Sequence, residues 1–273
     1  MLLLTSLLWG LAFVAQTDAA KYISPFTFQA TRTFLGALTL TPLLFITKAN
    51  LKDLKTLKAG IIIGIIFFFA ANIQQMGVPQ TTVAKAGFLT SLYIIIVPFI
   101  EFVIFKNKIG LKTLLCVILS TTGLFFLFKM NLSFNEGDIL VLLAAILFAV
   151  HVIAINRFNE YNPIAISFIQ FVVACILSAI VSIIFEKPTL ESILSARQSI
   201  MYAGIISCGV AYTLQIIGQQ KVNSTLSAIC LSMESFFAAV FGFILLKQSL
   251  SFQEIIGCAL MLTSIIISQI NNK

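Results

Sequence analysis

The sequence predicts an all-α integral membrane protein with ten transmembrane helices, arranged as two inverted five-helix repeats. Three observations lead to this prediction: the composition, ten long apolar runs, and the matching order of those runs in the two halves. Of 273 residues, 59% are hydrophobic and 10% are charged, and the mean hydropathy is +1.06. A soluble domain carries about 25% charged residues, so this chain has too few to cover a water-facing surface. A lipid bilayer suits this composition.

Ten apolar runs have lengths near that of a membrane-crossing helix, which needs about 20 residues within a range of about 17 to 25. They are hydrophobic on every side, as buried or lipid-facing helices are. They cover Leu2–Thr17, Pro25–Thr47, Ala59–Met76, Ala84–Phe105, Thr113–Phe128, Ile139–Ile155, Ile164–Phe185, Ile200–Gly218, Thr225–Leu246 and Ile255–Ile270. The first run has no basic segment before it, which argues against a signal peptide, and we expect a few further residues upstream. Alternating ten-residue segments, the mark of a transmembrane β-barrel, are absent from the sequence.

Lysine and arginine in the loops indicate the orientation, because cytoplasmic loops carry an excess of both. With a cytoplasmic N-terminus, ten of the seventeen basic residues fall on the inner side and five on the outer side, while Arg32 and Lys85 fall within spans. The inner group is Lys48, Lys52, Lys55, Lys58, Lys106, Lys108, Lys112, Arg157, Lys221 and Lys273, and the outer group is Lys21, Lys129, Lys187, Arg197 and Lys247. We therefore expect a multi-pass protein of the cytoplasmic membrane with both termini inside.

The two halves, residues 1–130 and 131–273, match each other in span number and loop length. An odd number of spans per half makes the second half run opposite to the first, which is the inverted-repeat plan of many secondary transporters. From Gln74 onward one offset of 141 aligns them without a gap. It pairs Gln74 with Gln215, Gly77 with Gly218, Ser91 with Ser232, Lys106 with Lys247 and Thr122 with Thr263.

Charge, cysteines and motifs exclude several classes of function. The net charge of +7 lies in short loops between apolar runs, which favours a membrane face over nucleic acid. The five cysteines lie inside apolar runs without metal-ligand spacing, so we interpret them as packing residues and expect no metal. No phosphate-binding loop, dinucleotide fingerprint or nucleophile elbow is present in the sequence, so we expect no cofactor and no ATP hydrolysis by this chain.

Four short motifs resemble one known family. They are LLWGLAF at 7–13, SPF at 24–26 before the Arg32 helix, TVAKAGFLTSLY at 82–93 and LSMESFFAA at 231–239. The chain is similar to the drug/metabolite transporter superfamily, specifically the EamA-type ten-helix exporters. The resemblance implies a basket of helices around a cavity lined by the first, third, fourth, sixth, eighth and ninth spans. It also implies export of amino acids or related metabolites, often driven by a proton or exchange gradient. Where the family often has Glu after the fourth and ninth helices, this chain has Asn107 and Gln248, which we interpret as a changed interfacial contact.

Ionisable residues inside spans are the main functional candidates, because each costs about 2.5–3.5 kcal/mol at the bilayer centre on insertion scales. Glu234 lies roughly ten residues from either end of the ninth run, too deep for its side chain to reach water. Burial favours the neutral form of such a carboxyl. Glu234 is therefore expected to carry a proton or to bind a substrate ammonium group; the alternative is a protonated carboxyl bonded to a neighbouring helix.

Three other charged residues have competing interpretations. Lys85 lies about 12 Å further out than Glu234, at about 1.5 Å per residue, and either extends to the outer interface or guides an anion into the cavity. Arg32, some 6 Å from mid-membrane on the same rise, is expected to pair with backbone carbonyls or a carboxyl, a structural role being favoured over a functional one. Glu101 is expected to be a solvated interfacial residue.

The remaining candidates are polar or aromatic residues at cavity depth. His151 titrates near physiological pH and could relay protons, although a hydrogen-bonded packing role is the alternative. The paired amides Gln74 and Gln215 either bind a polar substrate or join two helices. Pro98 lacks a backbone donor and predicts a bend for gating. The proposed substrate-binding set is Trp9, Gln74, Lys85, Tyr93, His151, Tyr212, Gln215 and Glu234.

Together these features predict a secondary exporter of amino acids or related zwitterions that works by alternating access. A drug or organic-cation exporter of the same fold is the first alternative, and a channel is the second. A membrane-embedded transferase is disfavoured, because it needs clustered His, Asp or Arg and the chain has one His. The expected partners are a small-molecule substrate, protons and the lipid bilayer, without nucleic acid, and the chain is compatible with a monomer.

Overall fold

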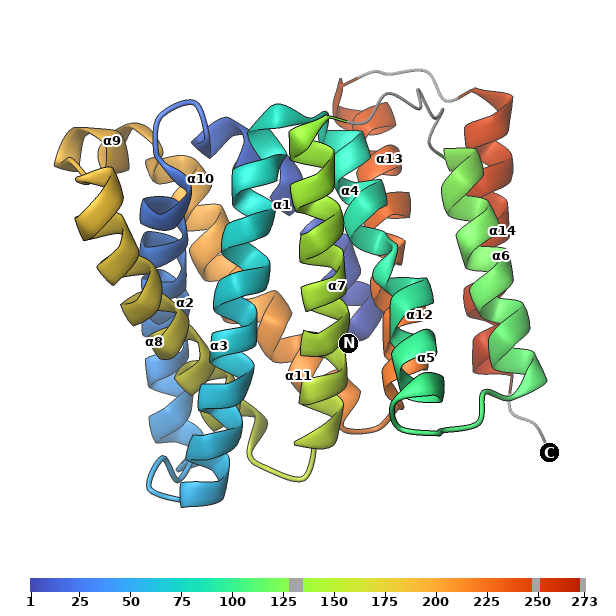
Figure 1. Cartoon of the computed structure of the whole chain (residues 1–273), viewed down its shortest axis with the longest axis horizontal. Helices are drawn as coiled ribbons and strands as arrows, with labels where there is room; N and C mark the ends of the chain where they lie inside the picture. The colour runs from blue at the N-terminus through green and yellow to red at the C-terminus, as the bar shows by residue number, and fades with distance from the viewer. Residues whose placement is uncertain (128–134, 247–250, 271–273) are drawn as a thin grey trace.

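The computed structural model of the chain describes residues 1–127, 135–246 and 251–270, and within these ranges its regular structure is entirely helical (Figure 1). The first half contains α1 (Leu2–Ala19), α2 (Pro25–Thr47), α3 (Leu54–Gly77), the 3₁₀ turn η1 (Val78–Gln80), α4 (Val83–Ser91), α5 (Tyr93–Val103) and α6 (Leu111–Leu127). The second half contains α7 (Glu136–Arg157), α8 (Pro163–Val181), the π-helical turn η2 (Ser182–Glu186), α9 (Leu190–Ser195), α10 (Arg197–Met201), the π-helical η3 (Tyr202–Tyr212), α11 (Thr213–Gln219), α12 (Ser224–Leu231), α13 (Met233–Leu246) and α14 (Phe252–Gln269).

These helices make up the ten predicted spans. Eight segments of the described chain are long and apolar enough to cross a membrane, and two shorter apolar helices, Leu111–Leu127 and Phe252–Ser268, complete five spans in each half. The predicted fold class is confirmed, and the helix ends differ from the predicted runs by a few residues. The third span, for example, begins at Leu54 and not at Ala59.

Polar caps explain where several spans begin. The side chain of Asp53 accepts hydrogen bonds from the backbone N–H groups of Lys55 and Thr56 at the start of α3. Asn162 caps α8 in the same way, and Asn223 caps α12. Asn135 and Asp138 form a capping box at the start of α7. Such side chains satisfy the backbone donors that a helix leaves free at its N-terminus, so they fix the ends of spans whose apolar pattern alone is continuous.

The fourth and ninth spans are each interrupted at corresponding places. The fourth span breaks at Leu92, between α4 and α5, and the ninth breaks at Ser232, between α12 and α13. At these points backbone bonds shorten to the i−3 pattern, from Leu92 N to Leu89 O and from Ser235 N to Ser232 O. Pro98 lies inside α5, six positions after the break at Leu92, so the interruption does not coincide with the proline.

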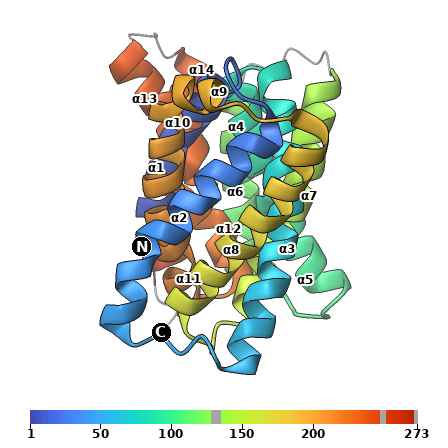
Figure 2. The ribbon, with the colours of Figure 1, turned by 90° about the vertical axis from the view of Figure 1, so that its left-hand side faces the viewer.

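Helix packing follows a pattern that an exchange of the two halves preserves. α2 packs along α8 and α6 along α14, while α3 packs along α7 as η3 packs along α1. Figures 1 and 2 show α2 and α8 together at one edge of the bundle and α6 and α14 at the other. The remaining spans lie between these two pairs.

Small residues allow the closest helix approaches. A Cβ on Gly60 of α3 would lie 2.7 Å from Ile169 of α8, and one on Gly64 would lie 2.9 Å from Val173. These two glycines, four residues apart, therefore let α3 approach α8 closely. At the other edge, a Cβ on Gly257 of α14 would lie 2.6 Å from the carbonyl oxygen of Gly123 in α6.

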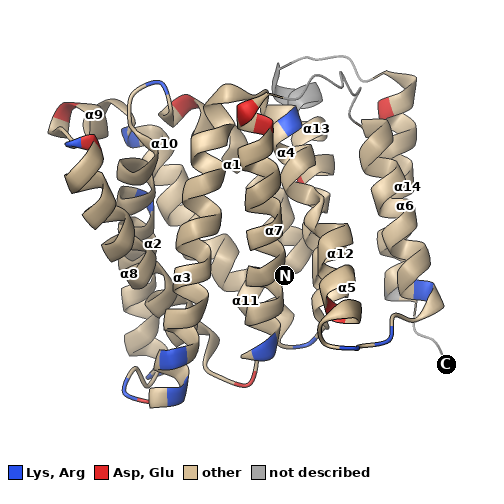
Figure 3. Ribbon diagram, in the orientation of Figure 1, with Lys and Arg blue, Asp and Glu red and all other residues tan. Residues whose placement is uncertain are grey.

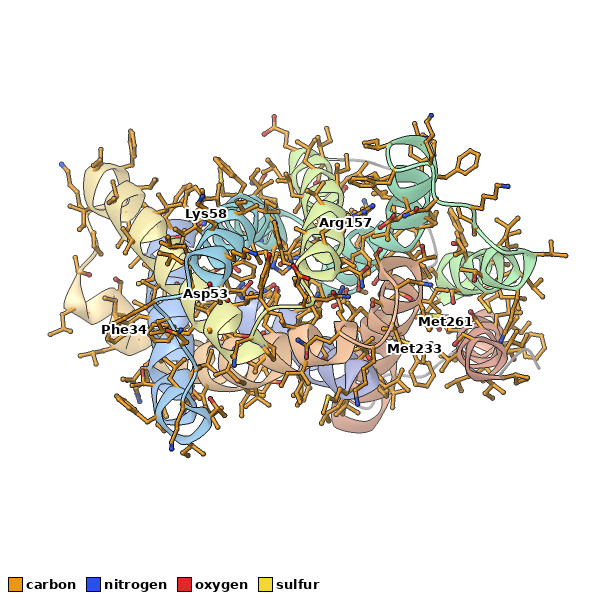
Figure 4. All side chains as sticks on the ribbon, turned by 90° about the horizontal axis from the view of Figure 1, so that it is seen from below. Phe34, Asp53, Lys58, Arg157, Met233 and Met261 are labelled. Carbon is orange, nitrogen blue, oxygen red and sulfur yellow. The ribbon has the colours of Figure 1, made fainter. Side chains whose placement is uncertain are left out.

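Charged residues gather at the two ends of the bundle, and Lys and Arg predominate at the lower end in Figure 3. That end holds the α2–α3 and α5–α6 connections and the C-terminal end of α7, with Arg157. Lys129, Lys247, Gln248 and Lys273, used in the orientation and family arguments, lie outside the described residues. Between the ends, large apolar side chains such as Phe34 face outward (Figure 4), as a lipid-facing surface requires.

Candidate functional site

A central cavity with a volume of about 30 Å³ lies among helices of both halves. Its lining comes from α1, α2, α3, α4, α5, α7, η3 and α13. The lining residues are Trp9, Ala12, Phe13, Gln16, Arg32, Gln74, Thr90, Tyr93, Phe148, Ser207, Tyr212 and Glu234. These are the six spans expected from the resemblance, with the second span added through Arg32.

Glu234 is the acidic residue of this cavity, and its side chain is only 3% exposed. Its Oε1 accepts hydrogen bonds from Tyr93 Oη at 3.1 Å and from Ser91 Oγ at 3.3 Å. Ser91 is held in turn by Ser235 Oγ at 2.6 Å. Within the described ranges no Lys or Arg forms an ion pair with Glu234, so a cation from outside the protein can pair with it, or a proton can neutralise it.

Arg32 is the basic residue of the cavity, and the predicted pairing of its side chain is wrong. The residue is 1% exposed, yet its Nε and Nη1 have no hydrogen-bond partner among the described residues. Its guanidinium carbon lies 5.6 Å from the ring centroid of Phe28. Glycines bring α2 close to η3 on this side: a Cβ on Gly204 would lie 3.0 Å from the Arg32 carbonyl oxygen. The resulting packing orients Arg32 into the cavity.

Two polar groups of α1 also lack partners. Trp9 Nε1 and Gln16 Oε1 are buried without a hydrogen bond among the described residues. The Trp9 ring packs on Tyr212 with their centroids 4.5 Å apart. Most buried polar groups of native proteins are hydrogen-bonded, so unpaired groups around one cavity indicate a place for a polar ligand.

Gln74, one of the two paired amides, lines the cavity and is part of a row of hydrogen-bonded side chains. Its Oε1 accepts a hydrogen bond from Gln16 Nε2 at 3.4 Å, and its Nε2 donates to Thr90 Oγ1 at 2.9 Å. Gln215 is buried outside the cavity lining, where its Nε2 donates to Gln219 Oε1 at 2.9 Å. The equivalent positions of these amides therefore do not give equivalent roles.

His151 lies behind the cavity wall. Its Nε2 is 3.1 Å from Gln170 Oε1, and its ring is surrounded by the rings of Phe67, Phe148 and Tyr212. It is fully buried and does not belong to the lining. The geometry matches the packing interpretation of this residue more closely than a role in direct substrate contact.

Lys85 also lies outside the lining, in a polar cluster between α4 and α7. Its Nζ is 2.6 Å from Oδ2 of Asp138, which is 0% exposed. Asp138 also accepts hydrogen bonds from Thr81 Oγ1 and from the backbone N–H of Asn135. The cluster joins the start of α4 to the start of α7 at the upper end of the bundle.

A second polar cluster, which the sequence does not predict, lies at the lower end of the bundle. Glu101, expected to be solvated, is only 6% exposed and accepts hydrogen bonds from Ser224, Asn107 and Arg157, the last at 3.3 Å. The Arg157 guanidinium also lies 3.8 Å from the Phe105 ring centroid. Viewed from below, Arg157 lies inside the outline of the bundle (Figure 4). The cluster joins α5, α7 and α12, and its members are too far apart in sequence for spacing to reveal it.

Comparison with known proteins identifies the family. The model of the EamA-like transporter family matches residues 1–129 and again residues 135–269. The chain belongs to the EamA-like transporter family. The family lies within the drug/metabolite transporter superfamily, so the chain is a multi-pass membrane transporter.

Relatives of this EamA-like chain agree with that assignment. An uncharacterized transporter of Archaeoglobus fulgidus is 30% identical over 97% of this chain and 83% of its own length. The Bacillus subtilis protein named uncharacterized transporter YoaV is 24% identical over 94% of this chain and 91% of its own length. A protein crystal structure at 17% identity matches with a TM-score of 0.78 and covers 98% of this chain and 95% of the other, which shows a shared fold.

Proposed function

We propose that this EamA-like transporter is a secondary carrier that exports amino acids or related zwitterions. The observation that carries the proposal is Glu234: a buried carboxyl with no ion-pair partner in the described protein, placed in a cavity lined by both halves. In the loaded carrier, a substrate ammonium group supplies the positive counter-charge for the Glu234 carboxylate. Buried charges in membrane proteins are expensive and commonly mark substrate or proton pathways, which supports this assignment.

The other residues of the predicted site differ in how directly they act on the substrate in this proposal. Trp9, Gln74, Tyr93 and Tyr212 contact the substrate from the cavity wall. His151 and Gln215 support that wall from behind, through Gln170 and Gln219. Lys85 stabilises the upper end through Asp138.

The transport mechanism we propose is alternating access between two inverted halves, residues 1–130 and 131–273. Packing that is preserved when the halves are exchanged supports the repeat, as do the corresponding breaks at Leu92 and Ser232. Interrupted helices at matching places commonly mark the binding site of such carriers. Pro98, which leaves the carbonyl of Ile94 without its helical donor, lets α5 bend during gating.

The two ends of the bundle are assigned to opposite sides of the membrane in this proposal. The lysine-rich lower end is assigned to the cytoplasm by the positive-inside rule, with both termini on that side. The Glu101 and Asp138 clusters then lie on the cytoplasmic and outer sides of the cavity, and each must separate when its side opens. Protons are the proposed coupling ion, because Glu234 can exchange a substrate ammonium for a proton.

The test is counterflow in proteoliposomes with a radiolabelled L-amino-acid mixture, with and without an imposed pH gradient. We expect saturable exchange that is abolished by Glu234→Gln. Glu191→Gln is the matched control, since Glu191 is an exposed residue of α9. Full exchange by a well-folded Glu234→Gln protein would contradict the role of this carboxyl. No exchange by the wild type would reject the substrate class.

An organic-cation exporter is the second candidate, favoured by the rings of Trp9, Phe148 and Tyr212 around the same carboxyl. Aromatic faces attract organic cations. A panel of quaternary ammonium compounds separates the candidates: competition by these cations with no competition by amino acids supports the second one. The unpaired guanidinium of Arg32 in the same cavity opposes it, because it repels a ligand that carries only positive charge.

A further inference from the structure

We propose that Arg32 binds the carboxylate of the transported substrate, with the indole N–H of Trp9 as a second donor. This inference rests on the proposed export of zwitterions and assigns the anionic end of the substrate to one wall of the cavity. It also determines which ammonium compounds the cavity accepts.

The Arg32 side chain is both charged and buried. A guanidinium stays charged in proteins, so burial cannot be relieved by loss of a proton. Arg32 is 1% exposed, and its Nε and Nη1 have no partner among the described residues. A buried charge of this kind requires a counter-charge, and α2 contributes no other residue to the cavity lining.

Two acidic residues, one bonded to the start of α2 and one in the cavity lining, have partners other than Arg32. Glu186 packs at the start of α2, where its two oxygens accept hydrogen bonds from the backbone N–H groups of Phe26 and Thr27. Glu234 is bonded to Tyr93 and Ser91, and no ion pair joins it to Arg32 within the described ranges. The other ionisable neighbours, Tyr212 and Cys208 on η3, are neutral groups at physiological pH.

Other polar residues line the cavity together with Arg32. Trp9 Nε1 is buried and has no hydrogen-bond partner among the described residues, and Ser207 of η3 lines the same cavity. The Trp9 ring packs on Tyr212, which lies on η3, and η3 packs along α2. Planar guanidinium forks match carboxylates closely, so Arg32 with these donors provides an anion site on the α2 and η3 side.

The two charged ends of a substrate then have separate places. Its carboxylate lies against Arg32 on the α2 side, and its ammonium lies against Glu234 on the α13 side. An amine without a carboxylate leaves Arg32 unpaired in the loaded cavity. Sites built to pair a polar group reject analogues that lack it far more strongly than they reject analogues of altered size.

The experiment compares each amino acid with its own decarboxylated amine as competitors of labelled L-amino-acid counterflow. For the wild type we expect each amine to compete at least about 100-fold more weakly than its amino acid. Arg32→Gln should lose most amino-acid exchange. In the exchange that remains, the inhibition constants of an amino acid and of its amine should lie within a few-fold of each other. Arg32→Lys, which keeps the charge, should retain part of the preference. Arg197→Gln, a change at an exposed arginine of α10, is the matched control.

The outcomes separate this inference from the proposed function. If the wild type exchanges amino acids but amines compete equally, the Arg32 assignment is overturned and the carrier proposal stands. The same conclusion follows if Arg32→Gln keeps the wild-type KM and preference. If the wild type exchanges no amino acid, the substrate class itself has failed. Thermal unfolding of each purified variant checks its folding, and the wild-type competition decides the question if both Arg32 variants misfold.

Discussion

Tyr93 Oη donates a hydrogen bond of 3.1 Å to Oε1 of Glu234, and the two residues occupy equivalent positions in the two halves. They are separated by the same offset of 141 that aligns the halves from Gln74 onward. Each also follows a helix break, since Tyr93 is the first residue of α5 and Glu234 is the second of α13. The two interrupted spans therefore meet at the carboxyl proposed to bind substrate.

Removing the Tyr93 hydroxyl should weaken substrate exchange without unfolding the protein. A net hydrogen bond to a charged group contributes about 1.5–3 kcal/mol, so Tyr93→Phe is expected to raise KM by about tenfold or more. Counterflow at varied substrate concentration measures this. Tyr22→Phe is the control, because Tyr22 is half exposed outside the cavity. An unchanged KM for Tyr93→Phe would mean that this bond does not position Glu234 for substrate.

Exchange by the wild type should depend on pH through Glu234. A protonated carboxyl offers no charge to an ammonium, so amino-acid affinity is expected to fall as the pH of both compartments is lowered together. KM measured across a pH series checks this, and any residual exchange by Glu234→Asp should keep the same direction. A KM independent of pH would remove Glu234 as the titrating partner of the ammonium.

Breaking the Lys85 and Asp138 pair should reduce stability and leave substrate preference intact. Lys85→Met leaves Asp138, which is 0% exposed, without its cation, although Thr81 and Asn135 still donate to it. Removing one partner of a fully buried ion pair lowers the free energy of unfolding by about 3–5 kcal/mol. We expect a loss of about 1–3 kcal/mol here, because the lysine side chain is 26% exposed. Thermal unfolding gives the loss, which Asp138→Asn should partly reverse in the double variant. A change in substrate preference instead would place Lys85 in the substrate path.

Loosening the Glu101 cluster should favour opening of the cytoplasmic side. Arg157→Gln removes an ion pair whose arginine side chain is 44% exposed. The free-energy difference between the closed and open states is therefore expected to change by no more than about 1 kcal/mol, which is about fivefold in their ratio. Cys230, a buried residue of α12, reports the change through its rate of alkylation in a protein with the other four cysteines replaced. An unaltered rate would show that the cluster does not hold that side closed.

Filling the α6 and α14 contact should destabilise the edge of the bundle. A Cβ on Gly257 would lie 2.6 Å from both the Gly123 carbonyl oxygen and the Leu127 backbone nitrogen, which cannot move aside as a side chain can. Overpacking of this kind costs about 1–3 kcal/mol. Gly257→Ala should therefore lower the unfolding temperature, while Gly110→Ala, with nothing within 4 Å of its Cβ, should not.

The sequence predicted the spans because lipid imposes length and hydrophobicity. It singled out Glu234 because depth alone marks a mid-membrane carboxyl as unusual, and this residue lines the cavity. It did not predict that Arg32 lines the same cavity or that Glu101 is buried. Depth along a helix does not reveal which face carries a residue, and Arg32 faces the cavity because glycines in α2 and η3 allow a close approach. Glu101 is buried and accepts a hydrogen bond from Ser224, which lies 123 residues further along the chain. Composition cannot reveal such contacts between distant segments.

The opposite charges of Arg32 and Glu234 have a consequence for the membrane voltage. One elementary charge crossing the bilayer exchanges about 2.3 kcal/mol with a potential of 100 mV. A cavity that holds one cation and one anion, loaded with a zwitterion, has no net charge to couple to that field. Exchange of one amino acid for another should then run at the same rate whether a potassium diffusion potential is imposed or not, and only the return of the carrier with a proton on Glu234 in place of the substrate would make transport electrogenic.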